Sequence, residues 1–213
     1  MSLSRRLELL RWAETQGAWI IEDDYDSIYR HSGHPLAALQ GLDNAGRVIY
    51  VGTFSKVLFP AMRAGYMVVP PDLVEPFHAM RAHVDRGSSV LEQVALASFI
   101  DEGHLARHIR RMVTLYRERQ AFFIQAANAE LNQLLTVEPN ATGLHLVGWL
   151  PKGSKDAEVS AQMAKVGVDA AALSSFALEP LNEPGLVLGY AAVPKTQIKE
   201  GIRRMHSVLQ DYY

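Results

Sequence analysis

The residues best suited to chemistry follow three short apolar runs of the sequence. In chain order they are Asp23-Asp24-Tyr25, Thr53-Phe54-Ser55-Lys56 and, a little further on, Arg63. Open α/β sheets place their ligands at the carboxyl ends of strands, so these side chains are expected to gather at one edge of a sheet.

Lys56 has the setting of a nucleophilic amine. Burial after an apolar run favours the neutral form of a lysine, which is the form that attacks a carbonyl carbon. The hydroxyls of Thr53 and Ser55, with a bidentate fork from Arg63, could hold phosphate oxygens beside it. Asp23 could keep a ring nitrogen protonated from the far end. The set therefore predicts an imine-forming lysine next to a phosphate-bearing heterocycle.

Each of these signals has a plainer interpretation when it stands alone. A Ser-Lys pair most often lies on the surface without a chemical role, and an Asp at the end of a strand is often a cap or turn residue. Asp24 and Asp26 are expected to bond their own backbone or a neighbouring Arg. The arginines within 110–119 are expected to form a solvated or interfacial helix face. The joint pattern, above all the Asp23 and Lys56 pair, is what favours a site.

The histidines are not expected to bind a metal. His31 and His34 lie in a Gly/Pro loop without an acidic or thiol partner at metal-ligand spacing, which predicts solvent exposure. His145 falls on an expected strand and is predicted to pack or hydrogen-bond at the edge of a core.

The periodicity of apolar residues predicts an α/β fold with a largely parallel sheet, followed by a smaller α+β unit. The expected domains are 1–103 and 104–213, the second including the connecting helix. Strands are expected at 18–21, 47–52, 65–69, 144–149 and 186–192, and helices at 4–16, 36–42, 72–85, 90–100, 105–135, 157–166 and 196–209.

Composition excludes several classes of function. The 213 residues are 48% hydrophobic and 21% charged with a net charge of −2, which is typical of a globular chain without the basic surface that direct nucleic-acid binding needs. The absence of Cys excludes disulfides and thiolate chemistry. No apolar run reaches the roughly 18–20 residues of a membrane span. A cytoplasmic location is expected.

Three blocks of the sequence resemble a known family. The blocks Ile20-Ile21-Glu22-Asp23-Asp24-Tyr25-Asp26-Ser27, Tyr50-Val51-Gly52-Thr53-Phe54-Ser55-Lys56 and Arg63-Ala64-Gly65-Tyr66 look like the signature blocks of fold-type-I aminotransferases. More closely, they resemble the aminotransferase-like domain of MocR-type regulators in the GntR superfamily. The resemblance covers essentially the whole chain and implies a partial aminotransferase large domain followed by the C-terminal small domain.

This resemblance implies that the chain binds pyridoxal 5'-phosphate. Lys56 would hold the cofactor as a Schiff base, Asp23 would pair with the pyridine nitrogen, and Tyr25 would donate to the phenolic oxygen of the ring. Thr53 and Arg63 would hold the phosphate, with Ser55 as a helper. By analogy with homodimers of this fold, Ser88 or Ser89 would reach the cofactor of a partner subunit.

The sequence departs from the family in two ways. Family members are longer at the amino end, where a winged helix-turn-helix and the opening part of the aminotransferase fold precede the matching region. About half a cofactor site is therefore expected here, with weak or no cofactor occupancy. Val187 also stands where aminotransferases usually carry an Arg for the substrate carboxylate, and Val cannot form a bidentate clamp.

Three functions remain open from the sequence. The first is the effector domain of a transcriptional regulator, which binds the cofactor and an amine or amino-acid effector while an absent N-terminal domain binds DNA. The second is a pyridoxal-phosphate-dependent aminotransferase acting on an amino acid, in which Lys56 also moves the substrate proton. The third is an inert segment that pairs with itself through exposed sheet edges.

Overall fold

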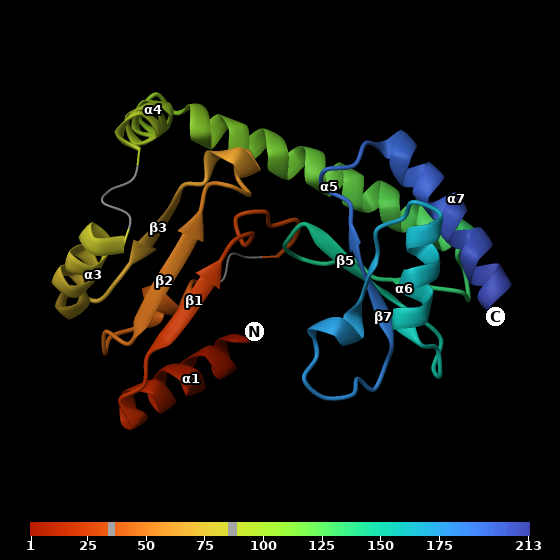
Figure 1. The fold of residues 1–213 in the computed structure, drawn as a ribbon, viewed down its shortest axis with the longest axis horizontal. Helices are drawn as coiled ribbons and strands as arrows, with labels where there is room; N and C mark the ends of the chain where they lie inside the picture. The colour runs from red at the N-terminus through yellow and green to blue at the C-terminus, as the bar shows by residue number, and fades with distance from the viewer. Residues whose placement is uncertain (34–36, 85–88) are drawn as a thin grey trace. The chain divides into compact units, whose positions relative to one another are not determined.

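Two separate sheets organise the chain in the computed structural model, which describes residues 1–33, 37–84 and 89–213 (Figure 1). Residues 1–28 and 33–109 form the first compact unit, and residues 29–32 and 110–213 form the second. Two residues considered in the sequence analysis, His34 and Ser88, lie outside the described residues.

The sheet of the first unit has the strand order β1-β2-β3. β1 (Ile20–Asp24) pairs in parallel with β2 (Val48–Thr53), which in turn pairs antiparallel with β3 (Gly65–Val68). α1 (Leu3–Gln16) leads into β1, and α2 (Leu39–Leu42) packs against β2. Because β1 and β2 run in the same direction, their carboxyl ends lie at the same edge of the sheet.

Both parallel strands extend further into polar sequence than the apolar runs predicted. The register pairs Ile20 with Val48 and continues to the pair of Asp24 with Gly52. Backbone hydrogen bonds define a ladder whatever the side chains are, so three acidic residues continue β1 to its end. The register therefore brings the acidic end of β1 beside the end of β2 that leads to Lys56.

Short helices complete the first unit. They are η1 (Pro60–Met62), α3 (Pro71–Val84), α4 (Val90–Asp101) and the beginning of α5 (His104–Glu130). The side-chain oxygen of Ser89 accepts a hydrogen bond from the backbone N–H of Glu92 at 3.5 Å, which caps α4. α4 is rich in apolar residues on every side, yet Leu96 is its one buried residue.

The second unit is built on a four-stranded antiparallel sheet in the order β4-β5-β7-β6. Its strands are β4 (Thr136–Val137), β5 (His145–Trp149), β6 (Ala171–Ala172) and β7 (Gly185–Gly189). The helical elements of this unit are the later part of α5, α6 (Asp156–Lys165), η2 (Leu173–Phe176) and α7 (Lys195–Tyr212).

The core of the second unit lies between one face of this sheet and its helices. Leu146 pairs with Leu188 and Gly148 with Leu186, so strand alternation turns all four residues to the same face. On α7 the buried residues recur at helical spacing and form one apolar stripe, made of Ile198, Ile202, Met205 and Leu209. Steric crowding explains why residue 148 is a glycine, because a Cβ there would lie 2.8 Å from side-chain carbons of Leu135 and Leu188. Within the described residues, no helix is both long and apolar enough to cross a bilayer.

Candidate cofactor site

The register of the parallel pair decides which side chains share a face at the edge of the sheet. Asp23 is the partner of Val51, and Thr53 follows Val51 by two residues. Paired residues in register point the same way and alternate along each strand, so Asp23 and Thr53 lie on one face. Asp24 and Tyr50 lie on the opposite face. The structure thus brings the predicted carboxylate and the first predicted hydroxyl to one side of the same edge.

Asp24 secures the turn that follows β1. Its carboxylate accepts hydrogen bonds from the backbone N–H of Ser27 at 3.1 Å, from the Ser27 hydroxyl at 2.5 Å and from the Tyr50 phenol at 2.9 Å. Burial raises the pKa of Tyr50, and its hydrogen bonds with Asp24 and Tyr66 raise it further. Of the two partners expected for Asp24, nearby backbone or an Arg, the backbone partner is confirmed, and the Tyr50 phenol is a further one.

Tyr25 follows directly and is 46% exposed. The negative charge of Asp26 raises the pKa of its phenol, with smaller contributions from burial and from Asp23. Its hydroxyl therefore stays protonated at neutral pH and is available as a hydrogen-bond donor. A hollow of about 220 Å³ is lined by Tyr25 and Thr53 together with Asp24, Tyr50, Val57 and Tyr66.

Lys56 lies in a tight turn directly after β2. The Thr53 hydroxyl oxygen accepts from the backbone N–H of Ser55 at 3.1 Å, and the Phe54 carbonyl accepts from Val57 N at 3.1 Å and Leu58 N at 2.8 Å. The turn is thus closed by bonds on both sides of the lysine. Lys56 itself is exposed, because the turn projects beyond the end of the strand. The prediction that burial favours its neutral amine is therefore wrong for this structure.

Arg63 lies close to this turn because β3 returns antiparallel to β2. The Ala64 carbonyl accepts from Phe54 N at 2.9 Å and from the Thr53 hydroxyl at 3.5 Å, which places Arg63 next to the turn. Arg63 is exposed and has a φ of 45°, a left-handed conformation that is uncommon for a residue with a Cβ. Such a strained conformation at an exposed Arg is of the kind found at ligand sites.

Ser89 lies near the same region. It lines a hollow of about 320 Å³ together with Arg63, Arg81 and Gln93. Its side chain caps α4, so the structure gives it a helix-capping role besides the partner-subunit role predicted by analogy.

Three residues near the site were given no individual role by the sequence analysis. The carboxylate of Glu22 accepts from the backbone N–H groups of Leu39 at 2.9 Å and Gln40 at 3.0 Å, and so anchors the start of α2. The ring of Tyr66 covers Gly52 so closely that a Cβ at Gly52 would overlap it. His108 bonds the Val57 carbonyl at 2.9 Å. None of the three partnerships is local in sequence, which is why periodicity and motif spacing did not reveal them.

Two expectations about histidines are wrong. His31 is 8% exposed rather than solvated, because its Nε2 lies 2.9 Å from the Gly143 carbonyl and 2.8 Å from the Tyr190 hydroxyl in the second unit. His145 is exposed rather than packed, since it points away from the core face of β5. Groups of acidic residues and histidines that could hold a metal ion are absent from the described ranges 1–33, 37–84 and 89–213.

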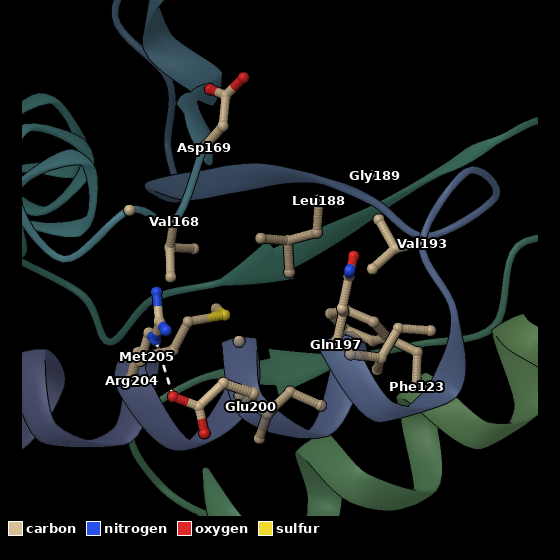
Figure 2. A pocket seen from close by; sticks show the side chains of 14 residues that line it. Phe123, Val168, Asp169, Leu188, Gly189, Val193, Gln197, Glu200, Arg204 and Met205 are labelled. Atoms are coloured by element: carbon tan, nitrogen blue, oxygen red, sulfur yellow. Dashed lines mark hydrogen bonds and ion pairs between the residues drawn. The ribbon is translucent and has the colours of Figure 1, made fainter.

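A separate cavity of about 460 Å³ lies within the second unit. Figure 2 shows Val168 and Leu188 facing side chains of α7 across it, with Glu200 joined to Arg204. The hydrogen bonds and charges of Arg203 and Arg204 lower the pKa of Glu200 to about 2, so this carboxylate is already paired. None of the residues that the sequence assigned to the lysine site lines this cavity.

The donor set of the first unit fits pyridoxal 5'-phosphate by its chemistry. It offers a carboxylate for a ring nitrogen at Asp23, a phenol at Tyr25, an amine at Lys56, and a hydroxyl and a guanidinium for phosphate at Thr53 and Arg63. These groups lie on segments that end or begin at the same edge of one small sheet.

Comparison with known proteins identifies the family of the chain. Residues 3–205 match the family model described as aminotransferase class I and II. The chain is 42% identical over 207 residues to the probable rhizopine catabolism regulatory protein MocR of Rhizobium meliloti, covering 97% of the chain and 42% of that protein. It is 38% identical over 205 residues to the uncharacterized HTH-type transcriptional regulator YhdI of Bacillus subtilis, covering 96% and 44%. The chain therefore spans less than half the length of either relative.

A solved structure confirms the predicted fold class. The crystal structure of Pyrococcus horikoshii kynurenine aminotransferase, in complex with PMP, KYN as substrates and KYA as products, superposes with a TM-score of 0.89. The two sequences are 28% identical, and the match covers all of this chain (100%) and 52% of the enzyme. The predicted resemblance to aminotransferases and to MocR-type regulators is likewise confirmed.

Proposed function

Because the chain belongs to the class I and II aminotransferase family, we propose that it is a pyridoxal-phosphate-binding, aminotransferase-like effector module. The observation that carries the proposal is the bonding at the end of β2. The Ala64 carbonyl joins the Lys56 turn to the segment bearing Arg63, and parallel pairing sets Asp23 on the neighbouring strand. This edge of the first sheet therefore carries a lysine, a carboxylate and the pair proposed to bind phosphate, Thr53 and Arg63.

In this proposal each residue has one task toward the cofactor. Lys56 holds it covalently through its amine, Asp23 keeps the pyridine nitrogen protonated, and Tyr25 donates a hydrogen bond to the ring oxygen. Thr53 and Arg63 hold phosphate oxygens, with Ser55 assisting. When bound, the cofactor supplies an aldehyde carbon that condenses with amines. These roles are supported by residue type and by the strand register.

We further propose that the module senses an amine or amino acid for a transcriptional regulator. Both regulators described above match over nearly the whole of this chain. DNA would be bound by a separate winged-helix domain, which agrees with a net charge of −2 on this chain. A homodimer is proposed by analogy with the fold, and Ser89 would then lie near the cofactor of the partner subunit.

An aminotransferase acting on an amino acid is the second candidate. The superposition on kynurenine aminotransferase favours it. Val187 weighs against it, because this residue sits mid-strand in β7, paired with Val147 and Ala171, and offers no cation to a substrate carboxylate.

One experiment separates the two candidates. The chain is titrated with excess pyridoxal 5'-phosphate, its absorbance is recorded, and amino acids are then added while oxo acid release is measured. The sensor proposal predicts an absorbance change on adding an amino acid without stoichiometric oxo acid. Steady release of oxo acid over several turnovers would establish the enzyme instead. Cofactor bound through Lys56 whose absorbance responds to no amino acid would contradict both.

A further inference from the structure

His108 contacts the backbone of the Lys56 turn from a helix 51 residues further along the chain. Its ring atom Nε2 lies 2.9 Å from the carbonyl oxygen of Val57, the residue that follows Lys56. Both residues belong to the first unit, where His108 lies on the early part of α5. A carbonyl only accepts hydrogen bonds, so Nε2 must carry the proton and donate.

Val57 is held at each of its polar atoms. Its backbone N–H donates to the Phe54 carbonyl at 3.1 Å, and its own carbonyl accepts from His108. Its side chain is 8% exposed and belongs to the buried residues of the first unit. Lys56 therefore precedes a residue that is fixed by a turn bond, by a helix side chain and by packing.

The bond to His108 ties the turn to a helix that is distant in the sequence. A hydrogen bond to a part-buried carbonyl stabilises the peptide that carries it, so removing the imidazole costs free energy and lets the turn move. The imidazole can supply the donor in either protonation state, because Nε2 carries a hydrogen in the required neutral tautomer and in the cation. The contact is thus suited to permanent positioning.

We propose that His108 is a positioning residue for Lys56. It fixes the Val57 peptide and thereby holds in one conformation the turn that bears Lys56, at the sheet edge where Asp23 and Thr53 also lie. The inference rests on the proposed cofactor role of Lys56, and it assigns His108 no contact with the cofactor itself.

The first readout needs no ligand. Amide hydrogen exchange is measured by NMR at Val57 and Leu58 in the 213-residue chain, in His108→Phe and in His108→Gln. Gln carries its amide nitrogen as many bonds from Cβ as Nε2 is in His, so it can restore the donor. Exchange at these two amides is expected to rise about fivefold in His108→Phe and to return toward the original rate in His108→Gln.

His104→Phe is the matched control. His104 lies one turn earlier on the same helix, where its Nε2 pairs with Glu102 at 3.0 Å and its ring stacks on Phe99. Its replacement should leave Val57 and Leu58 unchanged. If His108→Phe also speeds exchange in α3 and across the first sheet, His108→Leu replaces it, so that a local effect is separated from partial unfolding.

The second readout reports on Lys56 itself. Each variant is treated with pyridoxal 5'-phosphate and borohydride, and the label at Lys56 is compared with that at Lys152 by peptide mapping. The label at Lys56 should fall at least threefold in His108→Phe and recover in His108→Gln. Unchanged exchange, or unchanged labelling in His108→Phe, would overturn the inference. Equal labelling of Lys56 and Lys152 in the original chain would instead remove the proposed function of Lys56, and with it the reason to position that residue.

Discussion

The hydroxyl of Tyr190 lies 2.8 Å from Nε2 of His31, although 159 residues separate them in the sequence. Both side chains are buried, and the same hydroxyl donates to the Gly143 carbonyl at 2.7 Å and accepts from the Gln120 amide at 3.0 Å. The pair thus fixes residues 29–32, which follow directly from the turn bearing Tyr25, to the second unit.

Tyr190→Phe is expected to destabilise the second unit by about 1–3 kcal/mol, because it leaves buried partners unsatisfied while keeping the ring. Urea unfolding followed by near-ultraviolet circular dichroism measures the change. Tyr213→Phe is the control, since the Tyr213 hydroxyl bonds Ser154 at an exposed site. Equal midpoints for the two variants would contradict a structural role for the buried network.

This network also marks a limit of prediction from sequence. The sequence predicts that His31 is exposed and that His145 packs or hydrogen-bonds at the edge of a core. His31 is instead buried and His145 is exposed, because burial depends on partners far away in the chain. The order of strands and helices and the grouping of polar residues at strand ends could be predicted, because those signals are local. The exposure of Lys56 and the contacts of Glu22 and His108 could not, since they depend on how the turn and the helices meet.

Asp156 should make the second unit sensitive to acid. Asp156 is 6% exposed, and its burial opposes ionisation. The carboxylate accepts hydrogen bonds from Ser174, at 2.6 Å and 2.9 Å, and from the backbone of Gly185. These bonds outweigh burial and lower the pKa of Asp156. The folded pKa is below the unfolded one, so this stabilisation is complete above about pH 4 and is lost as pH falls through the folded value. Stability measured from pH 6 to pH 2 should fall less steeply in Asp156→Asn. An identical slope in both proteins would contradict this assignment.

Asp24→Asn should loosen the turn after β1 and lower the pKa of Tyr50. The Ser27 and Tyr50 hydroxyls donate to Oδ2 of Asp24 and the Ser27 backbone N–H donates to Oδ1, so an amide, with one acceptor oxygen and no charge, cannot keep all three bonds. A difference titration of tyrosinate absorbance between the two proteins should show one phenol ionising at lower pH in the variant. Superimposable titrations would mean that Asp24 does not contribute to the raised pKa of Tyr50.

Asp23→Ala should weaken cofactor binding without unfolding the first unit. A charge-assisted hydrogen bond contributes about 1.5–3 kcal/mol, which corresponds to roughly a tenfold to hundredfold loss of affinity. Asp101→Ala, which removes an exposed carboxylate at the end of α4, serves as the control. Fluorescence titration with pyridoxal 5'-phosphate measures both. If Asp23→Ala binds as well as the control, Asp23 does not pair with the ring.

The most direct test of the central claim is a map of covalent cofactor attachment over every lysine of the chain. The protein is incubated with excess pyridoxal 5'-phosphate, reduced with borohydride, digested and analysed by mass spectrometry, with Lys56→Arg in parallel. We expect the reduced adduct mainly on Lys56, even where affinity is weak, and its loss in Lys56→Arg without a rise elsewhere. Label spread evenly over Lys56 and the later lysines from Lys152 to Lys199 would show that Lys56 is not the cofactor lysine.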